Sequence, residues 1–163
     1  MSGNTFTADG VNVSVTDLIV RNGRIHVVDG VLLPSVGEIV QRAPEFSSLN
    51  AAVGAADSAP GTSPNLGPAL STPAGSGKYT LFAPSDNAFA QLASPPTGQA
   101  LTNVLAYHAL DLPYPVFAAD ALALPAPTAF ATLLGSTPGN QLLVSSSMTD
   151  VLIDDSGSPF PLR

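Results

Sequence analysis

The strongest constraint on the fold is a stretch of alternating apolar and polar residues at 11–33, interrupted by Asn22-Gly23. Apolar residues two apart lie on each side of the interruption: Val13, Val15, Ile25 and Val27. A period of two places such side chains on one face of a strand, and Asn-Gly readily takes the positive φ angles of a tight turn. The sequence therefore predicts a β-hairpin that turns at Asn22-Gly23 and ends at Pro34.

Helices are predicted directly after the hairpin. Ser35 and Glu38 have the spacing of a capping box, in which each side chain binds a free amide at the helix start. Pro44 is expected to end this helix and to open a second one. Four apolar residues of the second helix share one face: Phe46, Leu49, Val53 and Ala56. We expect that face to enter the core.

Further elements follow a Pro-, Ser- and Gly-rich loop at 57–77, which contains at most a short turn around Leu66 and Leu70. Residues 79–83 read as a compact strand, followed by a short helix with Ser85 or Asp86 as N-cap. A third amphipathic helix is predicted from residues at i, i+3, i+4 and i+7 spacing: Leu101, Val104, Leu105 and His108. Strands are expected at 129–134, 141–146 and 150–154. This order predicts an α+β domain whose sheet is assembled from both chain ends.

Composition excludes several classes of function. The 163 residues fit one domain, and 45% apolar with 10% charged residues favours a folded core over disorder. The net charge of −7, with five basic residues, argues against binding to nucleic acid or to anionic membranes. The sequence has no cysteine and no apolar run of membrane-spanning length. Its N-terminus lacks a basic start and an apolar run, so we expect no signal peptide in this sequence.

Three segments together resemble the fasciclin domain family. Tyr79-Thr-Leu-Phe-Ala-Pro-Ser-Asp-Asn-Ala-Phe89 looks like its first signature box, and Val104-Leu-Ala-Tyr-His108 like its Tyr-His segment. Asn22-Gly-Arg-Ile-His-Val-Val-Asp-Gly-Val-Leu-Leu-Pro34 looks like its second box, which normally closes the domain. The resemblance implies a fasciclin-like fold: a twisted β-sandwich or wedge with several short helices packed on it.

The order of the two boxes is reversed relative to the family. Residues 1–34 look like the end of a fasciclin domain and 35–163 like its beginning and middle, together making one domain at 1–163. Three explanations compete: a circular permutation, a fragment across the boundary of tandem repeats, or a chain that exchanges its terminal hairpin with a neighbour. Permutation is tolerated where the old ends lie close together. We favour a compact permuted monomer, in which residues 13–33 pack against Tyr79–Ala83.

The resemblance implies an extracellular or cell-surface, non-enzymatic adhesion, matrix or cell-wall module that binds protein or glycan. In the family the pair Tyr107-His108 is linked to integrin-type adhesion, although His108 on an apolar face is also typical of a hydrogen-bonded core histidine. Asn12-Val13-Ser14 is a glycosylation sequon, consistent with secretion. The alternative function is a carrier of an apolar ligand such as a carotenoid or lipid, which has precedent in the family.

No catalytic or metal-binding set is evident, and we predict no enzyme activity and no cofactor. The only histidines are His26 and His108, too few for a histidine-rich zinc site. His26 and Asp29 stand three apart in a strand and so face opposite ways. Asp150, Asp154 and Asp155 lack the spacing of a calcium loop and read as a solvated turn. In the boxes we assign structural roles to a further set: Thr80, Phe82, Asp86, Phe89, Asn22, Gly23, His26 and Asp29.

Overall fold

The computed structural model describes residues 6–71, 79–113, 116, 118–124, 127–137, 139–146 and 151–155. Strands and helices alternate along these residues. The strands are β1 (Thr7–Ala8), β2 (Val11–Val20), β3 (Gly23–Val28), β4 (Tyr79–Leu81), β5 (Ala109–Asp111), β6 (Thr128–Ala131), β7 (Gln141–Ser146) and β8 (Val151–Asp155). The helices are α1 (Val36–Arg42), the 3-10 turn η1 (Pro44–Phe46), α2 (Ser47–Ser58), α3 (Leu66–Leu70), α4 (Asp86–Phe89), α5 (Gly98–Tyr107) and α6 (Ala118–Leu122).

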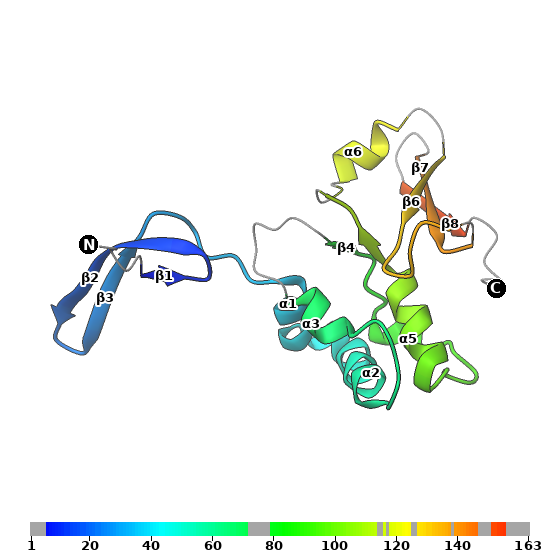
Figure 1. Cartoon of the computed structure of the whole chain (residues 1–163), viewed down its shortest axis with the longest axis horizontal. Coiled ribbons are helices and arrows are strands. Elements are labelled where there is room, and N and C mark those ends of the chain that lie inside the picture. The colour runs from blue at the N-terminus through cyan, green and yellow to red at the C-terminus, as the bar shows by residue number, and fades with distance from the viewer. Residues whose placement is uncertain are drawn as a thin grey trace.

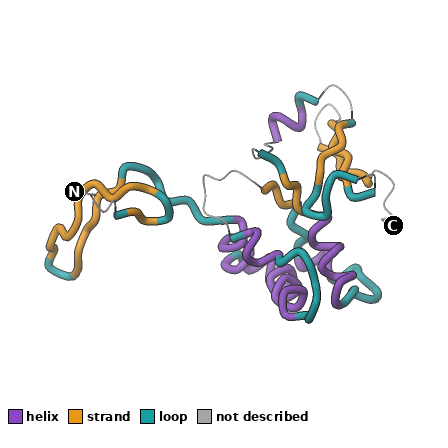
Figure 2. Tube along the Cα trace, viewed as in Figure 1, coloured by secondary structure: helices purple, strands orange, loops and turns teal. Residues whose placement is uncertain are grey.

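The chain divides into a hairpin arm, residues 6–33, and a body, residues 35–155. The arm is a three-stranded antiparallel sheet in the order β1-β2-β3. Figure 1 shows it projecting from the α1 end of the body, joined by an extended connection. Figure 2 shows that the helices α1, α2, α3 and α5 gather on one side of the body while its strands lie on the other.

The core of the body is formed mainly by its helices. α2 lies at the centre and contacts α1, α3, α4 and α5. Seven buried residues make up the main cluster: Val40, Leu49, Ala56, Leu66, Leu101, Leu105 and Ala106. Phe46, Val53, Leu81 and Phe89 pack against them from the surrounding elements. The helical periodicity of the sequence therefore identified the core face of α2 correctly.

The described strands of the body form two small sheets. β4 pairs with β5, and β6-β7-β8 form an antiparallel sheet. An isolated bridge between Leu110 and Thr132 connects them, next to a 2.9 Å hydrogen bond from the Leu133 N–H to the Ala109 carbonyl. Leu110 and Thr132 are both buried, so this junction ties α5, through β5, to the C-terminal sheet.

The α+β class is confirmed, and so are several local predictions. The Ser35–Glu38 capping box is complete: the Glu38 N–H donates to Ser35 Oγ at 3.2 Å and the Ser35 N–H to Glu38 Oε2 at 2.8 Å. The hairpin is present, although its second strand ends at Val28 and does not continue to Pro34 as predicted. Strands also lie at or near the predicted stretches 79–83, 129–134, 141–146 and 150–154. The short turn expected around Leu66 and Leu70 is α3.

The prediction of one sheet assembled from both chain ends is wrong. Among the described strands, β2 and β3 pair only with each other and with β1, and β4 pairs with β5. Alternation predicts a strand but not its partner, which depends on long-range packing. The compact permuted monomer required residues 13–33 to pack against Tyr79–Ala83, and the arm instead lies apart from β4 (Figure 1). The permuted arrangement is therefore not confirmed.

The turn of the hairpin lies one residue earlier than predicted. Val20 pairs with Gly23, so Arg21 and Asn22 form the two-residue loop. The left-handed residue near this end is Asp17, with φ 60°, at an irregularity in β2. A bulge increases the local right-handed twist, so the turn itself does not have to supply that twist through positive φ angles. The sequence pattern also missed β5 and α6, which are three and five residues long.

Candidate interaction site

The predicted Tyr107-His108 pair lies where α5 ends and β5 begins. The Tyr107 hydroxyl donates to the backbone carbonyl of Gln141 at 2.8 Å, which links α5 to the start of β7. Both side chains of the pair are half-buried. The tyrosine hydroxyl therefore serves an internal contact between two elements that are 34 residues apart in sequence.

His108 is the C-cap of α5 and is hydrogen-bonded within the fold. Its Nδ1 lies 2.7 Å from the Val104 carbonyl, and its own carbonyl accepts the Phe82 N–H at 2.9 Å. It is not part of the buried face of α5, which consists of Leu101, Thr102, Leu105 and Ala106. These contacts favour a structural role for His108, and its partner-binding role stays a prediction.

The first signature box lies around β4 and α4. Thr80 pairs with Leu110, and its Oγ1 accepts the Val116 N–H at 2.9 Å. Phe82 is half-buried, and Phe89 packs on the core cluster. Of the two predicted N-cap residues, Ser85 is the N-cap of α4, and the Asp86 carboxylate contacts Ser47 and Ser48 at the start of α2.

The predicted glycosylation site lies on the arm. Asn12 is exposed on β2, and its amide donates to the carboxylate of Asp29. The Asp29 N–H donates to the Asn12 carbonyl at 3.0 Å, so the two residues extend the β2–β3 ladder by one step. The hydrogen bond from Asn12 is the main reason that the pKa of Asp29 lies below its ordinary value, with Ser14 adding to the effect. Glycosylation of Asn12 stays a prediction.

The second signature box forms β3 and its flanks. His26 Nδ1 accepts the Asp17 N–H at 3.2 Å, and its ring lies 6.3 Å from that of Phe6. Arg24 approaches Asp17 at 3.4 Å in an exposed ion pair. His26 and Asp29 therefore bind different partners, as the strand alternation required.

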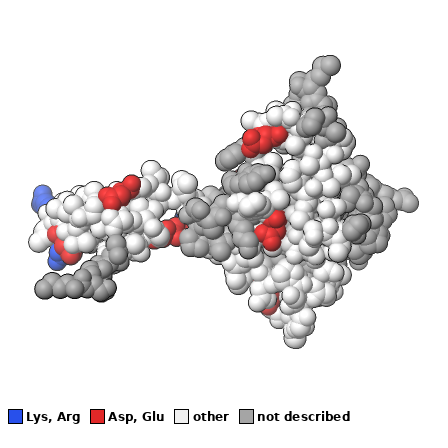
Figure 3. Space-filling model, turned by 45° about the horizontal axis from the view of Figure 1, so that its top comes forward, with Lys and Arg blue, Asp and Glu red and all other residues white. Residues whose placement is uncertain are grey.

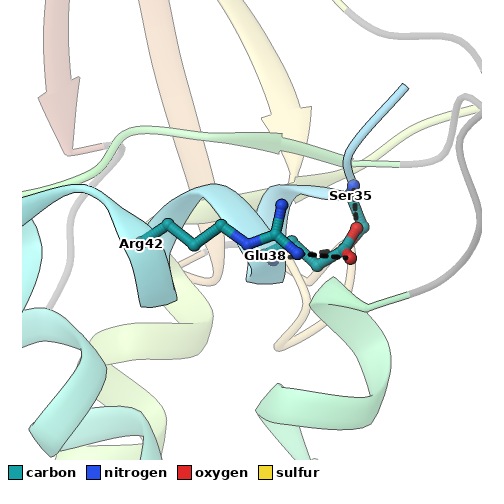
Figure 4. Close-up of polar contacts among 3 residues, drawn as sticks. All are labelled: Ser35, Glu38 and Arg42. Carbon is teal, nitrogen blue, oxygen red and sulfur yellow. Dashed lines mark hydrogen bonds and ion pairs between the residues drawn. The ribbon is translucent and has the colours of Figure 1, made fainter. Parts of the chain in front are cut away.

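A hollow of 570 Å³ lies where the arm meets the body. Its lining comes from both parts: Asp9, Leu32, Leu33, Pro34, Ser35, Glu38, Arg42 and Ser71. Figure 4 shows Glu38 reaching the Ser35 backbone while Arg42 lies alongside it, 3.5 Å away. The hydrogen bond from the Ser35 N–H chiefly holds the pKa of Glu38 below its ordinary value, and Arg42 adds to this. Three of the lining residues are charged: Asp9, Glu38 and Arg42.

Charge is sparse on the surface. In Figure 3 the visible basic side chains lie on the arm, and most of the visible body carries no charge. Among the described residues, no group of three or more His, Asp or Glu could hold a metal ion. Within the same residues, no helix has the length and hydropathy to cross a membrane.

Sequence reasoning missed two features. Asp57, at the end of α2, accepts the N–H groups of Leu66 and Gly67 at 2.7 Å each and so caps α3. An acidic residue nine positions before a helix gives no local capping signal. The second feature is the arm's exposed apolar side chains, because alternation shows which residues share a face but not whether that face is covered.

Comparison with known proteins identifies the family. No curated protein matches the chain significantly. The model of the fasciclin domain matches residues 45–156, which is more than two thirds of the chain and spans the body from η1 to β8. The chain therefore belongs to the fasciclin domain family.

Proposed function

We propose that this chain is a non-enzymatic adhesion module, located outside the cell or at its surface, that binds a protein or glycan partner. The observation that carries the proposal is the fasciclin match over 45–156, because domains of this family are typically extracellular or cell-surface adhesion modules. The body has a buried helical core and a hydrogen-bonded strand junction on which surface contacts could be presented.

Tyr107 and His108 are the residues that the family resemblance assigns to the contact. The Tyr107 hydroxyl holds α5 against β7, whereas the His108 ring binds the Val104 carbonyl within α5 itself. The bond from the Phe82 N–H reaches the His108 backbone and so does not depend on the His108 side chain. A substitution of Tyr107 would therefore reduce binding simply by loosening the contact between α5 and β7. We therefore propose that any effect of these residues on adhesion is largely indirect. The carrier function stays a prediction, with no observation among the described residues that favours it.

The test is attachment of cells to surfaces coated with the purified chain. Attachment above that on surfaces coated with an unrelated acidic domain is the expected result. Treating the cells first with a protease or with glycosidases distinguishes a protein partner from a glycan partner. Attachment no better than on the control surface with each of several cell types would contradict the proposal, provided that the coated chain retains its folded circular dichroism spectrum.

A further inference from the structure

The connection between the arm and the body is not held by hydrogen bonds. Residues 30–34 lie outside every helix and strand. Within the described part of the chain, neither their backbone nor their side-chain groups form a hydrogen bond. Peptide groups that have no partner in the fold are bound by water. A segment with few contacts and a solvated backbone moves more easily than the elements on either side of it.

On the arm side, the connection begins next to a pair of hydrogen bonds between Asn12 and Asp29. The Asp29 N–H donates to the Asn12 carbonyl at 3.0 Å, and the Asn12 side-chain amide donates to the Asp29 carboxylate. Gly30 also stays with the arm, since a methyl group at this position would lie 3.2 Å from Val11 Cγ1. The hydrogen-bonded and packed part of the arm therefore extends to residue 30.

On the body side, the connection ends at Ser35. This residue is buried, and the capping box joins its N–H to the Glu38 carboxylate and its hydroxyl to the Glu38 N–H. The ring of Pro34 fixes its own φ angle and favours an extended backbone at Leu33. The conformational freedom of the connection is therefore concentrated in Val31 and Leu32, with a smaller share in Leu33.

Packing between the arm and the body does not fix the direction of the arm. Among the described helices and strands, every extensive contact joins two elements of the arm or two elements of the body. Figure 1 shows the two parts joined by one extended segment next to α1. The 570 Å³ hollow borders this segment, lined by Asp9 from the turn between β1 and β2 and by Arg42 from α1. The hollow leaves space on one side of the connection.

We propose that residues 31–33 are a hinge, on which residues 6–30 of the arm swing as one rigid unit relative to the body. Hinges are a few loop residues that absorb changes in φ and ψ while the parts on either side keep their structure. The Asn12–Asp29 bonds and the Ser35–Glu38 box stay closed during the swing, and the width of the hollow changes. This proposal concerns the motion of the chain and stands apart from the proposed adhesion, which is tested with a different readout.

The first test measures distances between spin labels on introduced cysteines, which is possible because the sequence has no cysteine of its own. Asn22→Cys at the hairpin turn and Asn50→Cys on α2 form a pair across the hinge. Asn50→Cys and Ala129→Cys on β6 form the control pair within the body, and all three positions are exposed. Double electron–electron resonance should give a broad distance distribution for the first pair and a narrow one for the control. Equally narrow distributions would overturn the proposal.

Two double substitutions at the same positions test which residues form the hinge. Leu32→Pro with Leu33→Pro stiffens the segment and removes no hydrogen bond, so the distribution across the hinge should narrow toward that of the control pair. Leu32→Gly with Leu33→Gly gives the backbone more freedom and should broaden the same distribution. Identical distributions for the two variants would show that these residues do not control the direction of the arm, and would overturn the hinge.

The second test uses the unchanged chain and so does not depend on the folding of a variant. Backbone 15N relaxation reports how each part tumbles and how rigid each amide is. We expect the amides of β2 and β3 to share one rotational correlation time and those of α2 and α5 to share a longer one. The amides of residues 31–33 should have lower order parameters than either group. One correlation time for the whole chain, with order parameters at 31–33 equal to those of β2 and α2, would overturn the proposal.

Discussion

The carboxylate of Asp86 accepts the backbone N–H of Ser48 at 2.7 Å and the hydroxyl of Ser47 at the same distance. Ser47 and Ser48 are the first residues of α2, so a residue of α4 caps the central helix of the core from 38 residues away. Phe46, the N-cap of α2, has no side chain that could cap it. Asp86 therefore replaces a local cap with a tertiary one.

Asp86→Ala should lower the melting temperature by about 2–4 °C, since a lost helix cap exposes amide groups that no other side chain binds. Thermal unfolding followed by circular dichroism measures the change. Asn87→Ala is the matched control, because the Asn87 side chain is exposed in the same helix and only its backbone carbonyl accepts a bond from Gln91. Equal shifts for the two variants would contradict the capping role.

Stability should fall on acidification. Hydrogen bonds from Ser47, then Ser48, lower the pKa of Asp86 from 3.8, and the Ser35 N–H lowers that of Glu38 from 4.5. A pKa that is lower in the folded state than in the unfolded state gives stability that is complete above the unfolded value and is lost as pH falls through the folded one. Urea unfolding should thus show a midpoint that is steady above about pH 5 and decreases below pH 4.5. A midpoint that rises between pH 4.5 and 3 would contradict this assignment.

Gly67→Ala should be destabilising by about 1–2 kcal/mol. A methyl group at position 67 would lie 2.6 Å from Asp57 Oδ2, so the carboxylate that caps α3 would have to move. Gly54→Ala is the control: it lies in α2 with nothing within 4 Å of the added carbon, and should stabilise by up to about 1 kcal/mol through helix propensity. Chemical denaturation measures both. Similar stabilities for the two variants would count against the close contact.

Tyr107→Phe removes one hydroxyl while keeping the ring. The Gln141 carbonyl would lose this hydrogen bond, at a cost of about 0.5–1.5 kcal/mol. If Tyr107 and His108 affect adhesion only by stabilising the fold, cell attachment by Tyr107→Phe below its melting temperature should equal that of the unchanged chain. A loss of attachment by a variant with unchanged stability would instead assign the hydroxyl to the partner contact.

The parts of the fold that were predictable are those whose signal is local. The Ser35–Glu38 box and the buried face of α2 follow from spacing within one or two helical turns. The caps provided by Asp57 and Asp86 join residues brought together only by folding, so no local pattern marks them. β5 has three residues, too few to show a period, and it depends on pairing with β4.

The candidate site likewise combines features that have a local sequence signal with features that depend on long-range packing. The sequence identified Tyr107-His108 through its family resemblance, but the bond to Gln141 requires the meeting of α5 with β7. The arm was predicted as a hairpin, and its faces follow from the register that the structure defines. Its separation from β4 was not predictable, because the same alternation suits a strand within a larger sheet.

Amide hydrogen exchange of the arm and of the body, measured on one sample, tests most directly whether the arm stands apart from the core of the chain. An isolated hairpin opens easily and exchanges fast. We predict that the β2 and β3 amides exchange much faster than those of α2 and α5, which form the core cluster. Protection of β2 and β3 equal to that of α2 and α5 would contradict the account.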